Sequence, residues 1–492
     1  MATKNVIPNY INGAWVASTA SETLPVVNPA TQETIAEVPL SPAADIVTAA
    51  KAAAVAFPEW RRVPAIDRVQ YMFKLKQLYE ANKDELARIC TEEAGKTYGE
   101  SIGELQRGLE NIETACGIPT LMQGYNNEDI ARGIDEHMIR QPIGVTGMVA
   151  PFNFPAMIPL WFLPYAMASG NCMIVKPSEK CPRTQQRLFE LIDEMDLPPG
   201  VLQMVNGGKE SVDTMLDHPT IRSISMVGST PAAEYIYQRA AKNGKRAQCQ
   251  GGAKNPAVIM PDADMDKTVE IIADSAFGCA GQRCLALSVV ITVGEAGEAF
   301  RERFCDVAAK RTVGYGLDEG VEMGAIISHE SKDRIEGLIA KGEAEGAKVL
   351  VDGRGKLVEG YEKGSFLFPT VLDNVHPDST IARTELFGPV LALMHADTLD
   401  EAIALVNDRE YGNMACIFTS SGIDARKFRY EAYAGNIGIN VGVAAPMAQY
   451  PFSGWKRSFF GDLHAQSQHS VEFFTETKVI VERWPKEWHR KF

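Results

Sequence analysis

Hydrophobic positions in the first part of the chain recur at the spacing of helices. The alanine-rich stretch 44–57 predicts a helix capped by Ser41, and residues 104–117 predict another, with Arg107 among polar neighbours. A helix between these two is predicted by apolar residues that share one side: Val69, Met72, Phe73, Leu75, Leu78 and Tyr79.

Beyond residue 140 the pattern changes to short apolar runs that alternate with amphipathic stretches. Buried strands are predicted over 144–151, 171–177, 201–207 and 223–229, and helices over 183–195 and 232–242. A second α/β series begins at residue 255 and continues to about Val441, and the β-branched and aromatic stretch 471–484 predicts a strand. The alternation indicates an α/β fold of two doubly wound, mostly parallel units in tandem.

Composition and charge narrow the class of protein. The 492 residues are 45% hydrophobic and 23% charged, which is typical of a globular protein of several domains. The net charge of −14 argues against a nucleic-acid partner and gives no reason for binding to anionic membranes. The apolar stretch 157–173 is interrupted by prolines, Gly170 and Asn171, so we expect a buried core segment and no membrane span.

The N-terminus shows no basic segment followed by an apolar run, so we expect no signal peptide and a cytoplasmic location. Nine scattered cysteines fit a reducing compartment, and neither they nor the dispersed histidines have metal-ligand spacing. We therefore expect no metal.

Cys284 is the strongest candidate for chemistry. It follows glycines and small residues that allow close approach, and the charge of Arg283 would favour a thiolate. On these grounds alone a packing cysteine remains the more common interpretation. The turn at 227–230 before a helix could face a pyrophosphate, but an ordinary capped turn looks the same, as does a surface turn at Lys176 and Glu179.

Seven motifs, spread over nearly the whole chain, resemble those of the aldehyde dehydrogenase superfamily in kind and order. They are YINGAWV (10–16), APFNFP (150–155), VKPSE (175–179), VGST (227–230), GGAKNPAVIMPDAD (251–264), GQRC (281–284) and ELFGP (385–389). The resemblance implies an NAD-binding Rossmann-like domain of residues 1–122 and 143–250, and a catalytic thiol domain of residues 251–445. It further implies an oligomerisation β-arm of residues 123–142 and 470–492, a connection over 446–469, and a homotetramer, with a dimer as the alternative.

A closer resemblance is to the CoA-acylating methylmalonate-semialdehyde dehydrogenases. It rests on GELQRGLENIETACGIP (103–119), residues 151–171, GAKN (252–255), AGQRCLALS (280–288), SFFGDLH (458–464) and VEFFTETK (471–478). The activity implied is NAD-dependent oxidation of methylmalonate or malonate semialdehyde to propanoyl-CoA or acetyl-CoA, with loss of carbon dioxide.

The resemblance also implies roles for individual residues. Cys284 would attack the aldehyde, and the side-chain amide of Asn153 and the backbone N–H of Cys284 would hold the oxyanion. Arg107 and Arg283 would bind the substrate carboxylate. Glu179 would bind the adenosine ribose and favour NAD over NADP. The other residues expected around the dinucleotide are Ala150, Phe152, Lys176, Lys180, Gly228, Ser229, Gly251, Glu385 and Phe387.

Two departures from the superfamily pattern bear on the second half-reaction. Gln250 occupies the position of the glutamate that activates water in hydrolytic members, and an amide is not a general base at neutral pH. A slow hydrolytic step would leave time for the CoA thiol to attack. Asp462 is an uncertain substitute for another acidic residue of the superfamily, so we expect the positively charged nicotinamide ring to promote ionisation of Cys284.

Four alternatives remain open at the level of the sequence. The chain could be a hydrolytic enzyme for another short acidic aldehyde such as succinate semialdehyde, or a CoA-acylating enzyme for a sulfonated aldehyde. It could also be a thiol-dependent acyltransferase or esterase without a redox step. The last alternative is a non-enzymatic NAD-binding protein, which the pairing of Cys284 with Asn153 disfavours.

Overall fold

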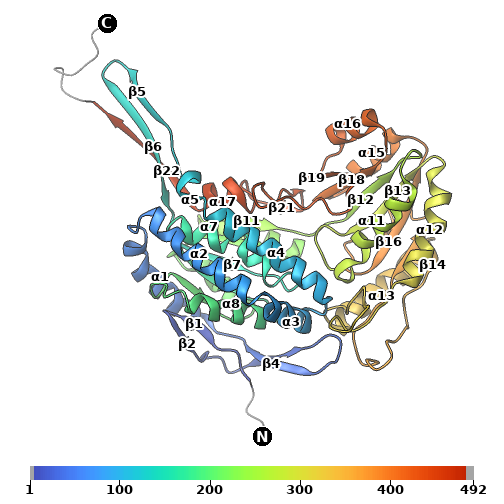
Figure 1. The fold of residues 1–492 in the computed structure, drawn as a ribbon, viewed down its shortest axis with the longest axis horizontal. Helices are drawn as coiled ribbons and strands as arrows, with labels where there is room; N and C mark the ends of the chain where they lie inside the picture. The colour runs from blue at the N-terminus through green and yellow to red at the C-terminus, as the bar shows by residue number, and fades with distance from the viewer. Residues whose placement is uncertain (1–4, 484–492) are drawn as a thin grey trace.

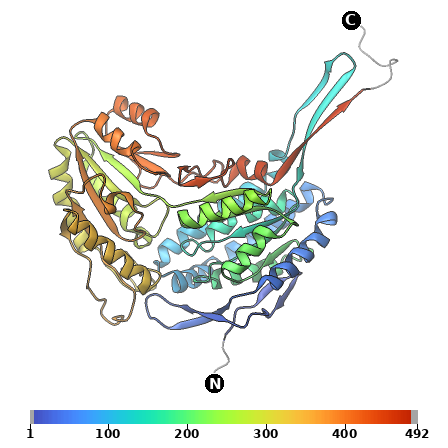
Figure 2. The ribbon, with the colours of Figure 1, turned by 180° about the vertical axis from the view of Figure 1, so that it is seen from behind.

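The structure, a computed structural model, describes residues 5–483. Two separate sheets form the centres of two bodies, and a narrow β-arm extends away from the first body (Figure 1). The view from behind shows the same separation, with the arm and the N-terminal strands at opposite ends of the first body (Figure 2). The α/β fold class predicted from the alternating pattern is confirmed.

The first body is built on an eight-stranded sheet in the order β2-β1-β9-β8-β7-β10-β11-β21, in which the central run from β9 to β11 is parallel. Its strands are β1 (Asn9–Ile11), β2 (Ala14–Val16), β7 (Val145–Val149), β8 (Cys172–Lys176), β9 (Leu202–Met204), β10 (Ile221–Val227), β11 (Arg246–Gln250) and β21 (Phe459–Phe460). The four strands predicted before residue 230 are therefore confirmed, and they read as apolar runs because both faces of the sheet are covered.

The helices of the first body pack on this sheet and on one another. They are α1 (Ala43–Trp60), α2 (Ala65–Ala81), α3 (Lys83–Ala94), α4 (Tyr98–Ala115), α5 (Ile118–Leu121), α6 (Met157–Leu160), α7 (Leu163–Ala168), α8 (Arg183–Asp193), α9 (Lys209–Asp217), α10 (Thr230–Lys242) and α17 (Ser467–Phe473). The apolar stretch 157–173 forms α6, α7 and the start of β8, and it is buried throughout.

The strand order predicts a ligand crevice at one edge of the first sheet. From β7 the chain runs outward to β8 and β9 on one side, whereas β10 and β11 lie on the other side. A ligand crevice forms where the strand order reverses, outside the carboxyl ends of the strands. The segments that follow β7, β8, β10 and β11 therefore meet at one edge, and these segments are the predicted dinucleotide motifs.

The second body contains a seven-stranded sheet in the order β14-β15-β16-β13-β12-β18-β19, parallel except for the edge strand β14. Its strands are β12 (Asn255–Ile259), β13 (Leu287–Val293), β14 (Lys348–Val351), β15 (Thr370–Asp373), β16 (Val390–Ala396), β18 (Met414–Phe418) and β19 (Asn436–Ile439). Its helices are α11 (Met265–Phe277), the 3-10 turn η1 (Gly278–Gly281), α12 (Ala296–Lys310), α13 (His329–Ala344), α14 (Thr380–Arg383), α15 (Leu399–Asn407) and α16 (Gly422–Glu431).

Three antiparallel strands form the arm, and two small sheets complete the fold. The arm has the order β22-β6-β5, with β5 (Asn126–Ala131), β6 (Ile134–Pro142) and β22 (Thr475–Glu482). The small sheets pair β3 (Thr23–Val27) with β4 (Thr34–Pro39) and β17 (Tyr411–Gly412) with β20 (Trp455–Lys456). The part of the predicted arm beyond residue 483 lies outside the described residues.

Three local predictions were wrong. Ser41 does not cap α1, because Pro42 occupies the N-cap position and the Ser41 hydroxyl instead hydrogen-bonds with Asn9 and Ser18. Phe73 is 47% exposed, so the buried side of α2 is narrower than predicted. The strand predicted over 471–484 begins only at Thr475, because residues 471–473 close α17 and bury two of their three side chains.

The described residues 5–483 include no helix that is long and apolar enough to cross a membrane. Within the same residues, no three His, Cys, Asp or Glu side chains gather in a way that could hold a metal ion.

Candidate active site

Cys284 lies in the loop that joins the turn η1 to β13. Before it, Cys279, Ala280 and Gly281 all have positive φ, at 52°, 51° and 70°. Such backbone costs about 1–3 kcal/mol for each non-glycine residue, and it persists only where its surroundings hold it. A Cβ on Gly281 would lie 2.2 Å from the carbonyl oxygen of Gly388, so the ELFGP segment packs directly against this turn.

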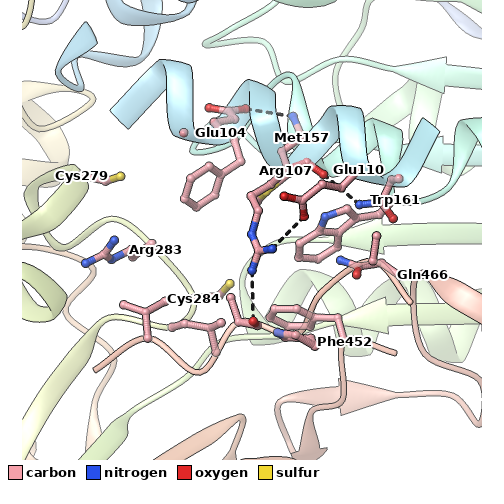
Figure 3. Close-up of a pocket in the computed structure, with 18 of the residues that line it drawn as sticks. Glu104, Arg107, Glu110, Met157, Trp161, Cys279, Arg283, Cys284, Phe452 and Gln466 are labelled. Carbon is pink, nitrogen blue, oxygen red and sulfur yellow. Dashed lines mark hydrogen bonds and ion pairs between the residues drawn. The ribbon is translucent and has the colours of Figure 1, made fainter. Parts of the chain in front are cut away.

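A cavity of about 250 Å³ opens between α4 and the Cys284 loop (Figure 3). Its apolar wall is formed by Phe154, Met157, Trp161, Leu285, Val443, Ala445, Pro446, Ala448 and Phe452. Its charged side chains are Glu100, Glu104, Arg107, Glu110 and Arg283. A concave, mostly apolar pocket with a few polar groups is typical of a small-molecule site. The cavity brings Arg107 of α4 together with the consecutive residues Arg283 and Cys284, which lie far from it in the sequence.

The Arg107 guanidinium extends from α4 into this cavity. Its Nη1 lies 2.8 Å from the Glu110 carboxylate, and its Nη2 donates to the carbonyl oxygen of Ala445 at 3.1 Å. Both contacts are drawn in Figure 3, where the Arg107 guanidinium points into the cavity on the side where the Cys284 sulfur lies. The ion pair holds Arg107 in one position, while the remaining N–H groups of the guanidinium can still bind an anion.

Arg283 also borders the cavity, but its guanidinium is already engaged. Its Nη2 donates to the carbonyl oxygens of Asp274 and Ser275, near the end of α11. The side chain thus offsets the negative end of that helix dipole. Carboxylate binding by Arg283 remains a prediction.

The environment of the Cys284 thiol favours its protonated form. Burial, and after it the charge of Glu385, raise the pKa of this thiol to about 12. The backbone N–H groups of Cys284 and Leu285 and the charge of Arg283 lower it, but they do not outweigh burial. A bound cation or a change in solvation is therefore needed before much thiolate forms at neutral pH.

Asn153 follows β7 and is 9% exposed. Its Nδ2 donates to the carbonyl oxygen of Gln282 at 3.0 Å, two residues before Cys284. The bond ties the loop after β7 to the loop that carries the cysteine. Because an amide nitrogen has two hydrogens, the second N–H of Asn153 can bind another acceptor.

A buried ion pair holds the loop that carries Asn153. Lys96 Nζ lies 2.5 Å from Glu104 Oε2 and donates to the carbonyl oxygen of Asn153 at 2.7 Å. The other carboxylate oxygen, Glu104 Oε1, accepts the N–H groups of Ala156 at 2.8 Å and Met157 at 3.0 Å. Both ends of the segment 153–157 are therefore anchored to the same pair.

The segment after β8 contains the residues expected at the adenosine ribose. Lys176 Nζ lies 3.1 Å from Glu179 Oε1, and burial lowers the pKa of this lysine. Lys180 Nζ lies 5.8 Å from the ring centroid of Phe152, which follows β7. The structure thus brings these four residues to the crevice edge of the first sheet.

The segments after β10 and β11 meet at the same edge. Ser229 stands at the N-cap of α10, but its side chain makes no capping bond, so it is available to a ligand. The N–H of Gly228 donates to the carbonyl oxygen of Gln250 at 3.1 Å. A Cβ on Gly251 would lie 2.8 Å from the carbonyl oxygen of Arg457, so only glycine fits there.

Glu385 and Phe387 approach this edge from the second body. Glu385 Oε1 accepts the N–H of Ala253 at 2.9 Å, and burial raises the pKa of this carboxyl to about 7. Phe387 makes an edge contact with Phe152 at 5.9 Å between ring centroids. The N–H of Ala150 donates to the carbonyl oxygen of Lys176 at 3.0 Å, which joins the ends of β7 and β8.

Gln250 is the last residue of β11 and is 3% exposed. Neither its Nε2 nor its Oε1 has a hydrogen-bond partner within the described residues. A buried amide without partners is costly, so this side chain is suited to a ligand group that supplies them.

Several residues of the site were not predicted from the sequence. Lys96, Glu104, Glu110 and Gln466 line the cavity or hold its walls. The spacing of Glu104, Arg107 and Glu110 along a helix is a signal that could have located one polar side of α4. Lys96 and Gln466 carry no local signal, because only the fold brings them here.

The chain matches the model of the aldehyde dehydrogenase family over residues 15–480, and it belongs to this family. It is 47% identical to the malonate-semialdehyde dehydrogenase of Halalkalibacterium halodurans over 98% of this chain and 99% of that protein. The methylmalonate-semialdehyde dehydrogenase structure from Oceanimonas doudoroffii has a TM-score of 0.96 at 43% identity, covering 98% of this chain and 99% of that one. A Sinorhizobium meliloti structure complexed with NAD has a TM-score of 0.97 at 41% identity, covering 99% of both chains.

Proposed function

We propose that this enzyme oxidises malonate or methylmalonate semialdehyde with NAD and transfers the acyl group to CoA, releasing carbon dioxide. The products would be acetyl-CoA or propanoyl-CoA. The observation that carries the proposal is a single cavity with the Cys284 thiol on one wall and the Arg107 guanidinium on another. The names of the similar proteins from H. halodurans and O. doudoroffii support the same substrate class.

The crevice edge of the first sheet fits a dinucleotide. Lys176 and Glu179 suit the hydroxyl groups of a ribose, and the carboxylate of Glu179 would repel the 2′-phosphate of NADP. The first turn of α10 offers N–H groups to a pyrophosphate, and the buried carboxyl of Glu385 suits the second ribose. When bound there, NAD supplies the acceptor for the aldehyde hydride. The similar S. meliloti structure was solved with NAD.

The chain's own residues perform the covalent chemistry. The Cys284 sulfur attacks the aldehyde carbon, and the oxyanion is held by the free N–H of Asn153 Nδ2 and by the backbone N–H of Cys284. Loss of hydride leaves a thioester on sulfur. Arg107 pairs with the substrate carboxylate and places the carbonyl carbon near the thiol.

Decarboxylation requires no additional residue. A β-carboxyacyl thioester loses carbon dioxide because the thioester carbonyl accepts the electron pair as an enolate, which is then protonated. The CoA thiolate attacks the resulting acyl group, and Cys284 leaves as thiolate. Since Gln250 cannot take a proton from water, hydrolysis does not compete effectively with CoA.

For the assembly, we propose a homotetramer, or a dimer, in which a partner chain covers the arm of β5, β6 and β22. Several apolar side chains of the arm are exposed, among them Ile130, Val479 and Val481. Exposed strands with apolar side chains are usually covered by a partner. The nine cysteines are free, which fits our expectation of the cytoplasm.

One assay tests the proposal. NADH formation from malonate semialdehyde is followed with and without CoA, and the product is identified by mass spectrometry. We expect acetyl-CoA and strong dependence on CoA. Free acid released rapidly without CoA would indicate a hydrolytic enzyme, and malonyl-CoA would contradict decarboxylation before transfer. Unchanged aldehyde oxidation by Cys284→Ala would reject the nucleophile itself.

A further inference from the structure

The carbonyl oxygen of Cys284 accepts hydrogen bonds from two side-chain amides. Asn255 Nδ2 and Asn413 Nδ2 each lie 2.8 Å from this oxygen. Both asparagines are buried, at 2% and 3% exposure. Asn255 begins β12 and Asn413 immediately precedes β18, so two neighbouring strands of the second sheet direct a side chain at one atom of the Cys284 loop.

Further contacts fix the orientation of the Asn255 amide and hold the backbone of Asn413. Asn255 Oδ1 accepts the N–H of Met414 at 3.1 Å, and its second N–H donates to Ala286 O at 2.9 Å. The oxygen and nitrogen of Asn255 are therefore assigned by their partners. The backbone of Asn413 is held by Asn436, whose Nδ2 donates to the Asn413 carbonyl oxygen at 2.8 Å.

Regular strand pairing does not account for these bonds. The pairing of β12 with β13 begins at Asn255 and Leu287, three residues after Cys284. The carbonyl of Cys284 thus lies beyond the ladder, and the two amides occupy both of its lone-pair directions. The peptide between Cys284 and Leu285 is held by side chains at a point where an ordinary loop would hydrogen-bond to water.

This peptide has a second connection to the reaction. Its N–H belongs to Leu285, and this N–H favours the ionised form of the Cys284 thiol by lowering its pKa. Two donors on the carbonyl oxygen of an amide polarise it and strengthen the donor at its other end. The two asparagine amides therefore hold the carbonyl end of the same peptide whose N–H end favours the Cys284 thiolate.

We propose that Asn255 and Asn413 are positioning residues that fix the Cys284–Leu285 peptide and, through its N–H, orient and stabilise the attacking thiolate. The inference rests on the proposed role of Cys284 as nucleophile. Neither asparagine lines the substrate cavity, so we assign both of them to holding the peptide and not to contact with the aldehyde.

The test uses Asn413→Leu, which keeps the approximate shape of the side chain and removes the donor. With NAD present, alkylation of Cys284 by iodoacetamide is measured against pH, and the modified peptide is identified by mass spectrometry. We expect the midpoint to rise by about one pH unit, which lowers the thiolate fraction at pH 7 about tenfold. The greater nucleophilicity of a more basic thiolate offsets part of this, so the alkylation rate falls about three- to fourfold.

A second variant tests whether negative charge near the Cys284 carbonyl raises the alkylation midpoint further. In Asn413→Asp a carboxylate replaces the donor next to the same oxygen, so the midpoint should rise further than in Asn413→Leu. We expect kcat to fall in the same order while KM for the aldehyde changes less than about twofold. Asn407→Leu is the matched control, because Asn407 also clamps backbone, at Glu431 and Tyr433, without touching Cys284.

The outcomes separate the two proposals. Wild-type alkylation and kcat in Asn413→Leu, with Cys284→Ala inactive, would overturn the role of the amides and leave the nucleophile in place. If Asn413→Leu fails to fold by thermal unfolding, Asn255→Asp tests the same carbonyl, because it keeps the acceptor for Met414 and loses the donor. An unshifted midpoint in that variant would also overturn the inference. Activity in Cys284→Ala would remove both proposals together.

Discussion

The Lys96 ammonium donates a hydrogen bond to the backbone carbonyl oxygen of Asn153 at 2.7 Å. Lys96 is 3% exposed and its partner Glu104 is 2% exposed, so the pair lies out of water directly behind the proposed oxyanion amide. A charge-assisted bond in such surroundings fixes the loop more firmly than a neutral one. The geometry of the oxyanion site thus depends on a pair of residues that do not themselves touch the sulfur.

Replacing Lys96 by Met should destabilise the protein and weaken catalysis together. The substitution leaves the Glu104 carboxylate buried without its cation, which typically costs about 3–5 kcal/mol of unfolding free energy. We expect kcat to fall because the loop of Asn153 loosens. Urea unfolding and steady-state kinetics measure both effects. In the double variant Lys96→Met/Glu104→Gln part of the lost stability should return, and a loss below about 1 kcal/mol in the single variant would contradict this view.

Replacing Gln250 by Glu should give the enzyme a hydrolytic activity. The new carboxylate would stand at the end of β11 and could take a proton from water that attacks the thioester. The measurement is multiple-turnover NADH formation without CoA, with free acid quantified. Gln250→Met is the control, since it has similar volume and no base. Equal CoA-independent rates in the two variants would show that another group limits hydrolysis.

Arg107→Ala should impair a carboxylated semialdehyde far more than propanal. Hydrogen bonds to a charged group contribute about 1.5–3 kcal/mol, so kcat/KM for the semialdehyde should fall about 10- to 150-fold. The loss for propanal should stay within about threefold, because this substrate has no carboxylate. Glu110→Gln is a useful companion: it keeps the guanidinium and removes its ion-pair partner. Equal losses on both aldehydes in Arg107→Ala would exclude Arg107 from carboxylate binding.

The sequence predicted the sheet framework well because buried parallel strands appear as apolar runs, as in 171–177 and 223–229. It also placed Arg107 on a helix, and the structure agrees. Predictions failed at the ends of elements. Pro42 takes the N-cap position that was expected of Ser41, and residues 471–473 end the helix α17 although Val471 and Phe473 favour strands.

The residues that could not be predicted are those whose role arises only from tertiary contacts. Asn413 lies 129 residues from Cys284 in the chain, and nothing in its neighbours indicates that it reaches the Cys284 carbonyl. Lys96 is separated by 57 residues from the Asn153 carbonyl that it holds. Such pairs have no period and no local pattern, whereas motifs such as GQRC and ELFGP are recognisable by themselves.

The ionisation of Cys284 should depend on NAD. Burial and the charge of Glu385 raise the pKa of the thiol to about 12, well above the ordinary value near 8.5. A thiol with a raised pKa is protonated at neutral pH and becomes reactive only as the pH increases, so alkylation without NAD should be slow at pH 7. The cationic nicotinamide ring close to the sulfur would favour the thiolate and lower this pKa. We therefore expect the alkylation midpoint to move to lower pH with saturating NAD, and less so with NADH, whose ring is neutral. Iodoacetamide labelling rates across pH 6–10 show this as faster labelling at each pH with NAD, and a profile that is the same with and without NAD would assign the activation of Cys284 to another group.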